Sequence, residues 1–111
     1  MFPTMPAADP PAAGAAPAVS APQRADAEIA ALFKALAHPA RIQLARFLST
    51  QESCYFGSLA ERLPQSRSTV SQHITQMKDG GLIKAPESGD RGCYCLDREA
   101  LARLKAFVAS L

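Results

Sequence analysis

Three cysteines are the residues of this chain whose type and spacing permit the most specific chemistry. Cys93 and Cys95 stand two positions apart in the segment CYCL. In an extended segment both thiols leave the same face, roughly 6.5 Å apart at the α-carbons, and cannot easily form a disulfide with each other. Cys54 lies in QESCYF, a second short segment for which a brief strand is predicted. Thiols grouped in this way could bind a soft metal ion or a metalloid, or undergo reversible oxidation.

Apolar residues at helical spacing predict the helices that flank these segments. A first helix starts near Asp26, which can cap it, and ends at His38-Pro39, because the residue before proline is pushed out of the helical region. Proline is favoured at the first position of a helix, so a second helix starts at once in ARIQLARFLST. Asp97 caps a last helix over DREALARLKAFVASL. The side chains predicted to face inward are Ile29, Leu32, Phe33 and Leu36 in the first helix, Ile42, Leu44, Phe47 and Leu48 in the second, and Leu101, Leu104, Val108 and Leu111 in the last.

The middle of the chain has the pattern of two helices joined by a turn and followed by a hairpin. SLAERL predicts a short third helix, Pro64-Gln65 a turn, and Ser66 the cap of a longer helix over RSTVSQHITQMKDG, which Gly80-Gly81 can end. LIKAPE and CYCL are short extended segments joined by SGDRG, which predicts a hairpin. The predicted fold is therefore mainly α with a small β-hairpin wing, a winged helix-turn-helix.

The longer helix has a polar side that is suited to DNA. Val70, Ile74 and Met77 are predicted to hold it to the core, and no acidic residue occurs between Ser66 and Lys78. Polar side chains on the opposite side can donate to phosphates or read base edges in the major groove, chiefly from the N-terminal half of the helix. The predicted DNA contacts are Arg67, Ser68, Thr69, Ser71, Gln72, His73, Gln76 and Lys78, with Arg91 from the hairpin. We expect His73 and Lys78 to touch the DNA backbone. The net charge of only +2 leaves open a winged helix that binds protein instead.

Two motifs in this part of the chain resemble a known family. ALAHPARIQLARFL and LPQSRSTVSQHITQMKDGGLI are similar to segments of the ArsR/SmtB family of bacterial metal-sensing repressors, and the resemblance covers roughly residues 25 to 111. It implies a homodimeric repressor that binds double-stranded operator DNA and leaves it on binding an inducer. It also implies that the first and last helices form the dimer interface, for which the available apolar side chains are Ile29, Leu32, Phe33, Leu101, Leu104 and Val108.

A winged helix is expected to bring the three thiols together. The strand before the helix-turn-helix pairs with the last strand of the wing, and cross-strand neighbours have β-carbons only about 5 Å apart. Cys54, Cys93 and Cys95 are therefore predicted to form one metal site. Trivalent arsenic and antimony bind three sulfurs, so As(III) or Sb(III) is the expected inducer, followed by soft divalent ions. Zinc usually takes four ligands, and no fourth ligand is evident.

The site departs from the best-known sites of the family. Many arsenic-sensing members have a Cys-Val-Cys motif at the start of the third helix, where this chain reads CYFG and only Cys54 matches. Zinc sensors of the family use ligands on the last helix, which has no histidine here. The arsenic-responsive assignment therefore depends on geometry more than on a matching motif.

Two alternatives use the same cysteines. A disulfide from Cys54 to Cys93 or Cys95 would make the protein a redox or reactive-sulfur sensor. The cysteines could also be small buried hydrophobic residues, which would require Tyr94 and Leu96 to face solvent.

Composition limits the remaining classes of function. Residues 1–23 hold six of the nine prolines and are predicted to be a disordered Pro/Ala-rich tail, which leaves residues 24–111 as one DNA-binding domain. No apolar run approaches the roughly 18 residues of a membrane span, and no secretory signal is evident, so we expect a cytoplasmic protein that does not contact the membrane. Cys-x-x-Cys and Gly-rich phosphate loops are absent, so we expect neither an enzyme nor an organic cofactor.

Overall fold

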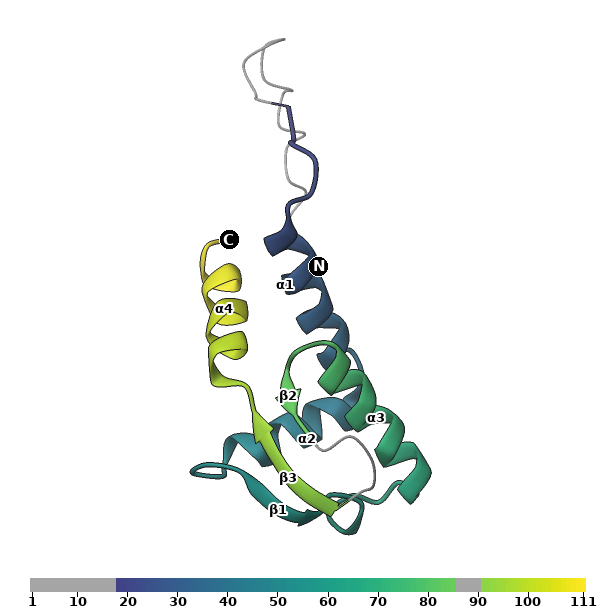
Figure 1. The fold of residues 1–111 in the computed structure, drawn as a ribbon. Helices are drawn as coiled ribbons and strands as arrows, with labels where there is room; N and C mark the ends of the chain where they lie inside the picture. Colours follow the sequence, from purple (N-terminus) through teal and green to yellow (C-terminus); the bar gives the residue numbers. More distant parts are fainter. Residues whose placement is uncertain (1–17, 86–90) are drawn as a thin grey trace, which may run out of the picture.

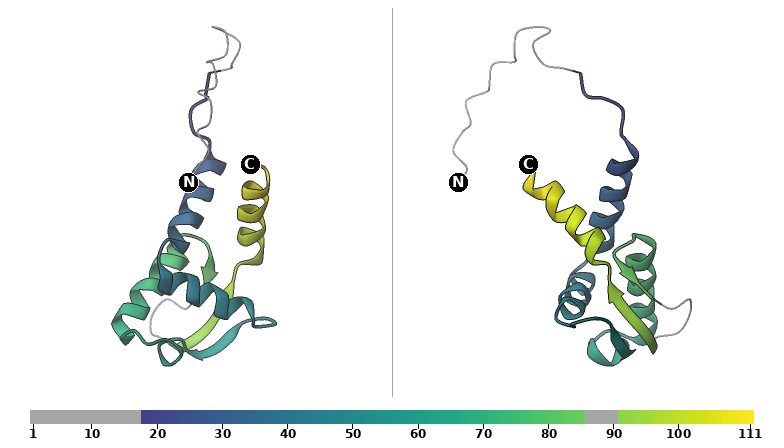
Figure 2. Two further views of the ribbon diagram at one scale, coloured as in Figure 1. Left: turned by 180° about the vertical axis from the view of Figure 1, so that it is seen from behind. Right: turned by 60° about the vertical axis from the view of Figure 1, so that its left-hand side comes forward.

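The computed structural model describes residues 18–85 and 91–111 and has the arrangement of a winged helix-turn-helix (Figure 1). Its elements are α1 (Arg24–Leu36), α2 (Pro39–Ser49), β1 (Tyr55–Ser58), the 3-10 helix η1 (Ala60–Arg62), α3 (Arg67–Asp79), β2 (Ile83–Lys84), β3 (Arg91–Leu96) and α4 (Arg98–Ala109). Both views in Figure 2 show α1 and α4 projecting from the same end of the domain, with the sheet at the other end. The described helices include none that combines the length and the apolar character needed to cross a bilayer.

The helix boundaries follow from local capping. Pro39 occupies the first turn of α2, and His38 precedes it in an extended conformation with Nδ1 accepting from the backbone N–H of Ala40. Ser66 caps α3, and Asp97 caps α4 by accepting from the N–H of Ala100. These three boundaries confirm the sequence predictions.

The start of α1 differs from the prediction in detail. The helix begins at Arg24, and Asp26 is its third residue rather than its cap. The Asp26 carboxylate instead accepts from the backbone N–H of Gln23 at 2.8 Å. A carboxylate at this position satisfies a backbone donor at the positive end of the helix, so the residue still stabilises the helix start.

The predicted hairpin and the predicted strand before the helix-turn-helix form one three-stranded antiparallel sheet. Its order is β1-β3-β2, with Tyr55 opposite Tyr94, Phe56 opposite Cys93 and Ile83 opposite Leu96. This confirms the predicted pairing of the strand before the helix-turn-helix with the last strand of the wing. The SGDRG connection falls mostly in residues 86–90, outside the described residues.

The core lies between the helices and one face of this sheet. It includes Leu32, Leu44, Leu48, Leu59, Val70, Ile74, Met77, Tyr94 and Leu104. The predicted short third helix is a single 3-10 turn, because Pro64 follows it closely and cannot donate the hydrogen bond that would extend it.

Four of the predicted inward side chains are exposed: Phe33, Ile42, Val108 and Leu111. Ile42 is 45% exposed, because Ala40, Leu44 and Leu48 form the buried side of α2 and Ile42 lies off that side. Leu111 is 88% exposed because α4 ends at Ala109, before this position.

The end of α3 packs closely on α1 at Gly80. A Cβ atom placed on Gly80 would lie 2.7 Å from the Cβ of Ala35 and 2.8 Å from the carbonyl oxygen of Ala31. Gly80 has an ordinary helical φ of −76°, so the close approach to α1, not backbone strain, requires glycine here. The following Gly81 has φ +80° and supplies the left-handed residue that ends the helix.

We therefore expect Gly80→Ala to lower the free energy of unfolding by about 1–3 kcal/mol, because the added methyl group overpacks the contact between α1 and α3. Urea denaturation of the reduced protein, followed by circular dichroism, measures this change. An unchanged unfolding midpoint would contradict the close packing of α1 on the end of α3.

Candidate functional site

The three cysteines meet at the junction of β1 and β3. Cys54 directly precedes β1 and, at a Cα–Cα distance of 4.4 Å, forms a disulfide with Cys95 of β3. Cys93 is a free thiol whose Sγ lies 3.6 Å from the Sγ of Cys95. All three sulfur atoms lie within 4.8 Å of one another. The predicted convergence of the cysteines is therefore observed, although Cys54 and Cys95 are 41 residues apart in the sequence.

The alternation of β3 places these sulfur atoms on the outer face of the sheet. Tyr94 is fully buried and Leu96 is 6% exposed, so the residues between them project to the opposite face. Phe56, which pairs with Cys93, is 72% exposed. The three cysteines are half-buried. The alternative that the cysteines are core residues, with Tyr94 and Leu96 facing solvent, is therefore wrong. The half-buried sulfur atoms are accessible from the outer face of the sheet.

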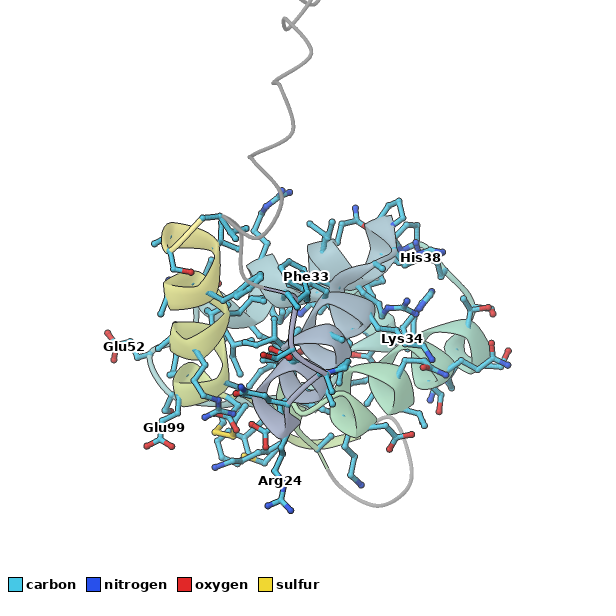
Figure 3. The ribbon with its side chains drawn as sticks, turned by 90° about the horizontal axis from the view of Figure 1, so that it is seen from above. Arg24, Phe33, Lys34, His38, Glu52 and Glu99 are labelled. Atoms are coloured by element: carbon cyan, nitrogen blue, oxygen red, sulfur yellow. A yellow bond between two sulfur atoms is a disulfide. The ribbon has the colours of Figure 1, made fainter. Side chains whose placement is uncertain are left out.

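The ligand set available at this cluster is entirely sulfur. No His, Asp or Glu joins the three cysteines among the described residues. In Figure 3, the side chains of Glu52 and Glu99 extend outward from the loop after α2 and from the start of α4. Three thiolates without nitrogen or oxygen ligands suit soft, thiophilic ions in preference to hard cations.

Tyr55 connects the sulfur cluster to the helix-turn-helix. It follows Cys54 in the chain, and its hydroxyl accepts from Arg62 Nε at 3.1 Å. Its ring packs edge-on against Phe47 of α2, with centroids 5.0 Å apart. Arg62 belongs to η1, the first helix of the helix-turn-helix, and its bond to Tyr55 raises the pKa of the guanidinium above its already high ordinary value. A displacement at Cys54 therefore has a direct route to η1.

Arg98 makes a second connection, between α4 and the loop that leads to Cys54. Its Nη2 donates to the backbone carbonyls of Ser49 at 3.4 Å and Gln51 at 3.0 Å. A cation at this place also interacts favourably with the negative end of α2. Neither the role of Arg98 nor the contact between Tyr55 and Arg62 was predictable from the sequence, because both join segments that are distant along the chain or follow a turn. The only sequence signal was the Tyr-Phe pair after Cys54.

The exposed side of α3 presents most of the predicted DNA contacts. The exposed or half-buried residues there are Arg67, Ser68, Thr69, Ser71, Gln72, Gln76 and Lys78, together with Thr75. Val70, Ile74 and Met77 hold the opposite side in the core, as predicted. Arg91 is the first residue of β3, and its side chain lies outside the described part of the chain.

His73 does not share this exposed side. Its ring is 8% exposed and packs against the ring of His38, with centroids 4.3 Å apart. Its Nδ1 lies 3.3 Å from Nη1 of Arg41, whose Nη2 donates to the carbonyl of Lys34. In Figure 3, Lys34 and His38 lie on the same side of the molecule, opposite α4. The expected position of His73 at a DNA phosphate is thus corrected, because its place on α3 turns the ring toward the α1–α2 junction.

The residues predicted for a dimer interface divide into two groups. Leu32 and Leu104 are buried within the single chain, and Ile29 and Leu101 are half-buried. Phe33 and Val108 are 43% and 51% exposed. Phe33 contacts Phe107 of α4 edge-on, with centroids 6.0 Å apart. The α1–α4 face therefore combines side chains that join the two helices within one chain with apolar side chains that remain exposed.

Comparisons with known proteins agree with this architecture. Residues 36–84 match the model of a helix-turn-helix domain. The HTH-type transcriptional regulator YgaV of Escherichia coli is 34% identical over 84 residues, which cover 76% of this chain and 82% of that protein.

Solved structures give the same result. A possible transcriptional regulator for arsenical resistance has a TM-score of 0.56 and 31% identity, covering 72% of this chain and 81% of that one. The cadmium sensor CmtR of Mycobacterium tuberculosis has a TM-score of 0.50 and 34% identity, covering 72% of this chain and 82% of that one. These relatives are transcriptional regulators and not enzymes.

The environment of His73 predicts a pH dependence of stability. Burial lowers the pKa of His73 below its ordinary value of 6.5, and the nearby His38 and Arg41 lower it further. The unfolded chain therefore takes up this proton before the folded chain does. The contribution of neutral His73 to stability is complete above about pH 6.5 and is lost as the pH falls from there toward the lowered pKa of the folded state.

Urea denaturation at a series of pH values below and above this range measures the effect. We expect the wild-type protein to lose more stability on acidification than His73→Gln, whose side chain does not titrate. Equal slopes for the two proteins would contradict a lowered pKa at His73.

Proposed function

Because this chain belongs to the ArsR/SmtB family of winged helix-turn-helix transcriptional regulators, we propose that it is a repressor that trivalent arsenic or antimony releases from operator DNA. The observation on which this proposal depends is the convergence of three sulfur atoms within 4.8 Å. The similarity to a possible regulator of arsenical resistance and to a cadmium sensor supports metal sensing as the general function. In this proposal the protein acts as a homodimer through α1 and α4, and each α3 enters a major groove.

The residues present fit a thiophilic inducer. Reduced Cys54, Cys93 and Cys95 would supply three thiolates on one exposed sheet face, and no competing oxygen or nitrogen ligand lies among them in the described residues. A bound As(III) or Sb(III) ion would join β3 to the segment that enters β1. Cys54 and Cys95 can act as ligands only after their disulfide is reduced, so inducer binding requires the reduced protein.

The contacts around the cluster support a route to the DNA-binding helix. A bound ion would fix Cys54 relative to Cys93 and Cys95 and would thereby reposition Tyr55, which holds Arg62 of η1. It would also pull on the loop that Arg98 joins to the start of α4. Release of DNA requires that the inducer bind more tightly to the protein conformation that DNA does not select. The contact of Tyr55 with Arg62 leads to the helix-turn-helix, and the contact of Arg98 with Gln51 leads to the proposed dimer helix. A change in either contact can therefore make the inducer-bound conformation differ from the one that DNA selects.

The disulfide between Cys54 and Cys95 favours a second candidate, a redox-sensing repressor. In this reaction the two thiols lose two protons and two electrons and form one S–S bond. A peroxide or a small-molecule disulfide takes up the electrons and is reduced to water or to two thiols. Cys93 is not needed for this reaction, whereas it is the third ligand of the metalloid site. The role of Cys93 therefore separates the two candidates.

The metalloid proposal predicts that arsenite releases the reduced protein from its own upstream DNA at one equivalent per subunit, because three sulfurs form one site. Fluorescence anisotropy of labelled DNA measures the release. We expect Cys54→Ser, Cys93→Ser and Cys95→Ser each to raise the arsenite concentration required by roughly tenfold or more. Ser53→Ala, next to the cluster, is the matched control and should respond like wild type. DNA binding that arsenite leaves unchanged would refute the metalloid proposal.

The redox candidate makes a different prediction about Cys93. Oxidised wild-type protein should have one alkylatable thiol and reduced protein three, which mass spectrometry after alkylation counts. If oxidation controls DNA binding, an oxidant should release wild type and Cys93→Ser equally, and should not affect Cys54→Ser or Cys95→Ser. Oxidised and reduced proteins with the same DNA affinity would exclude this candidate.

A further inference from the structure

A cleft between α2 and η1 is lined by none of the three cysteines and by no residue of α3. Its volume is about 360 Å³, at the lower end of the size range of small-molecule sites. It is lined by Gln43, Leu44, Arg46, Phe47, Thr50, Arg62 and Leu63. One wall of the cleft belongs to α2, and the other, Arg62 and Leu63, lies at the end of η1. No residue of α3 lines the cleft, so the cleft does not include the side chains that we assign to DNA.

The guanidinium of Arg62 is held in a defined position beside this cleft. Its central carbon lies 5.9 Å from the centroid of the Phe47 ring and 5.6 Å from that of the Tyr55 ring. Its Nε donates to the hydroxyl of Tyr55. A guanidinium has two NH₂ groups in addition to Nε, and these can bind a carboxylate in a bidentate manner. Because the two aromatic contacts and the hydrogen bond to Tyr55 restrict the Arg62 side chain, less conformational entropy is lost when an anion binds.

The rest of the lining specifies the chemistry of a ligand. Arg46 supplies a second cation, and the lining contains no acidic residue. Leu44, Phe47 and Leu63 form apolar walls, and Gln43 and Thr50 add groups that can donate hydrogen bonds. Two arginines together with an aromatic and aliphatic wall match a small anion with a flat apolar body. A fully hydrated inorganic anion would leave the apolar walls without a partner.

We propose that this cleft binds a small aromatic carboxylate, with the carboxylate on Arg62 and Arg46 and the ring against Phe47. The site is independent of the cysteines and so does not rest on the proposed metalloid response. It shares Arg62 with the contact from Tyr55, which follows Cys54 in the chain. Occupation of the cleft would therefore act on the same side chain through which we expect the sulfur cluster to reach η1.

Titration of the reduced, metal-free full chain with benzoate tests the proposal. The protein has two tyrosines, Tyr55 beside the cleft and Tyr94 fully buried in the core. We expect benzoate to shift the ring NMR signals of Tyr55 in a saturable manner and to leave those of Tyr94 nearly unchanged. Arg62→Gln should weaken binding roughly tenfold, or about 1.4 kcal/mol, and Arg46→Gln should weaken it less, because only Arg62 is positioned by aromatic contacts. Benzamide, the neutral analogue, should bind at least tenfold more weakly than benzoate.

Arg24→Gln is the matched control, because Arg24 is exposed at the start of α1 and does not line the cleft. It should bind benzoate like wild type. Equal binding by wild type and Arg62→Gln, or by benzoate and benzamide, would overturn the proposal. Absence of saturable benzoate binding to wild type would also overturn it, and loss of operator-DNA affinity by both cleft variants would then assign the two arginines to a nucleic-acid surface. Circular dichroism verifies that each variant is folded.

Discussion

The pairing of β1 with β3 is the constraint on which the proposed sensing site depends. It places Cys54 opposite Cys95 and adjacent to Cys93, although the chain passes through η1, α3 and β2 between them. Because side chains alternate along a strand, a shift of one residue in this register would turn the Cys54 side chain toward the opposite face. Tyr94 of β3 opposes such a shift, because its side chain is fully buried on the face of the sheet opposite to the cysteines.

The same pairing determines where a signal can travel. Tyr55 follows Cys54 in the chain and contacts both Phe47 of α2 and Arg62 of η1. Arg98 begins α4 only three residues after Cys95 and bonds to the carbonyl groups at the end of α2. The sulfur cluster therefore lies close to the helix-turn-helix on one side and to a proposed dimer helix on the other. A change in its structure can act on both. In a domain of this size, few side chains separate the sulfur cluster from either helix, so the coupling between them can be direct.

The position of α3 is defined by contacts on its buried side. Gly80 permits the end of α3 to lie against α1, and His73 occupies the space beside His38 and Arg41. The His73 site brings together groups that are cationic or can become so, hence the ring is most stable there when neutral. These contacts leave the polar side of α3 exposed, so that the helix can present its short polar side chains while its orientation stays fixed.

Local sequence was sufficient to predict much of this protein. Pro39, Ser66 and Asp97 act on their own neighbouring residues, so the helix starts that they specify were predictable. The two-residue spacing of Cys93 and Cys95 likewise determines that their thiols share a face. The exposure of Ile42, the burial of His73 and the contacts of Arg62 and Arg98 were not predictable in this way. Each depends on which remote element packs against the residue, and helical periodicity identifies an apolar side without identifying its partner. The sequence by itself determined the order of the elements, the helix starts at Pro39, Ser66 and Asp97, and the shared face of Cys93 and Cys95. Only the tertiary structure decided that Cys54 pairs with Cys95 and that His73 is buried, because strand register and helix packing join residues that are distant along the chain.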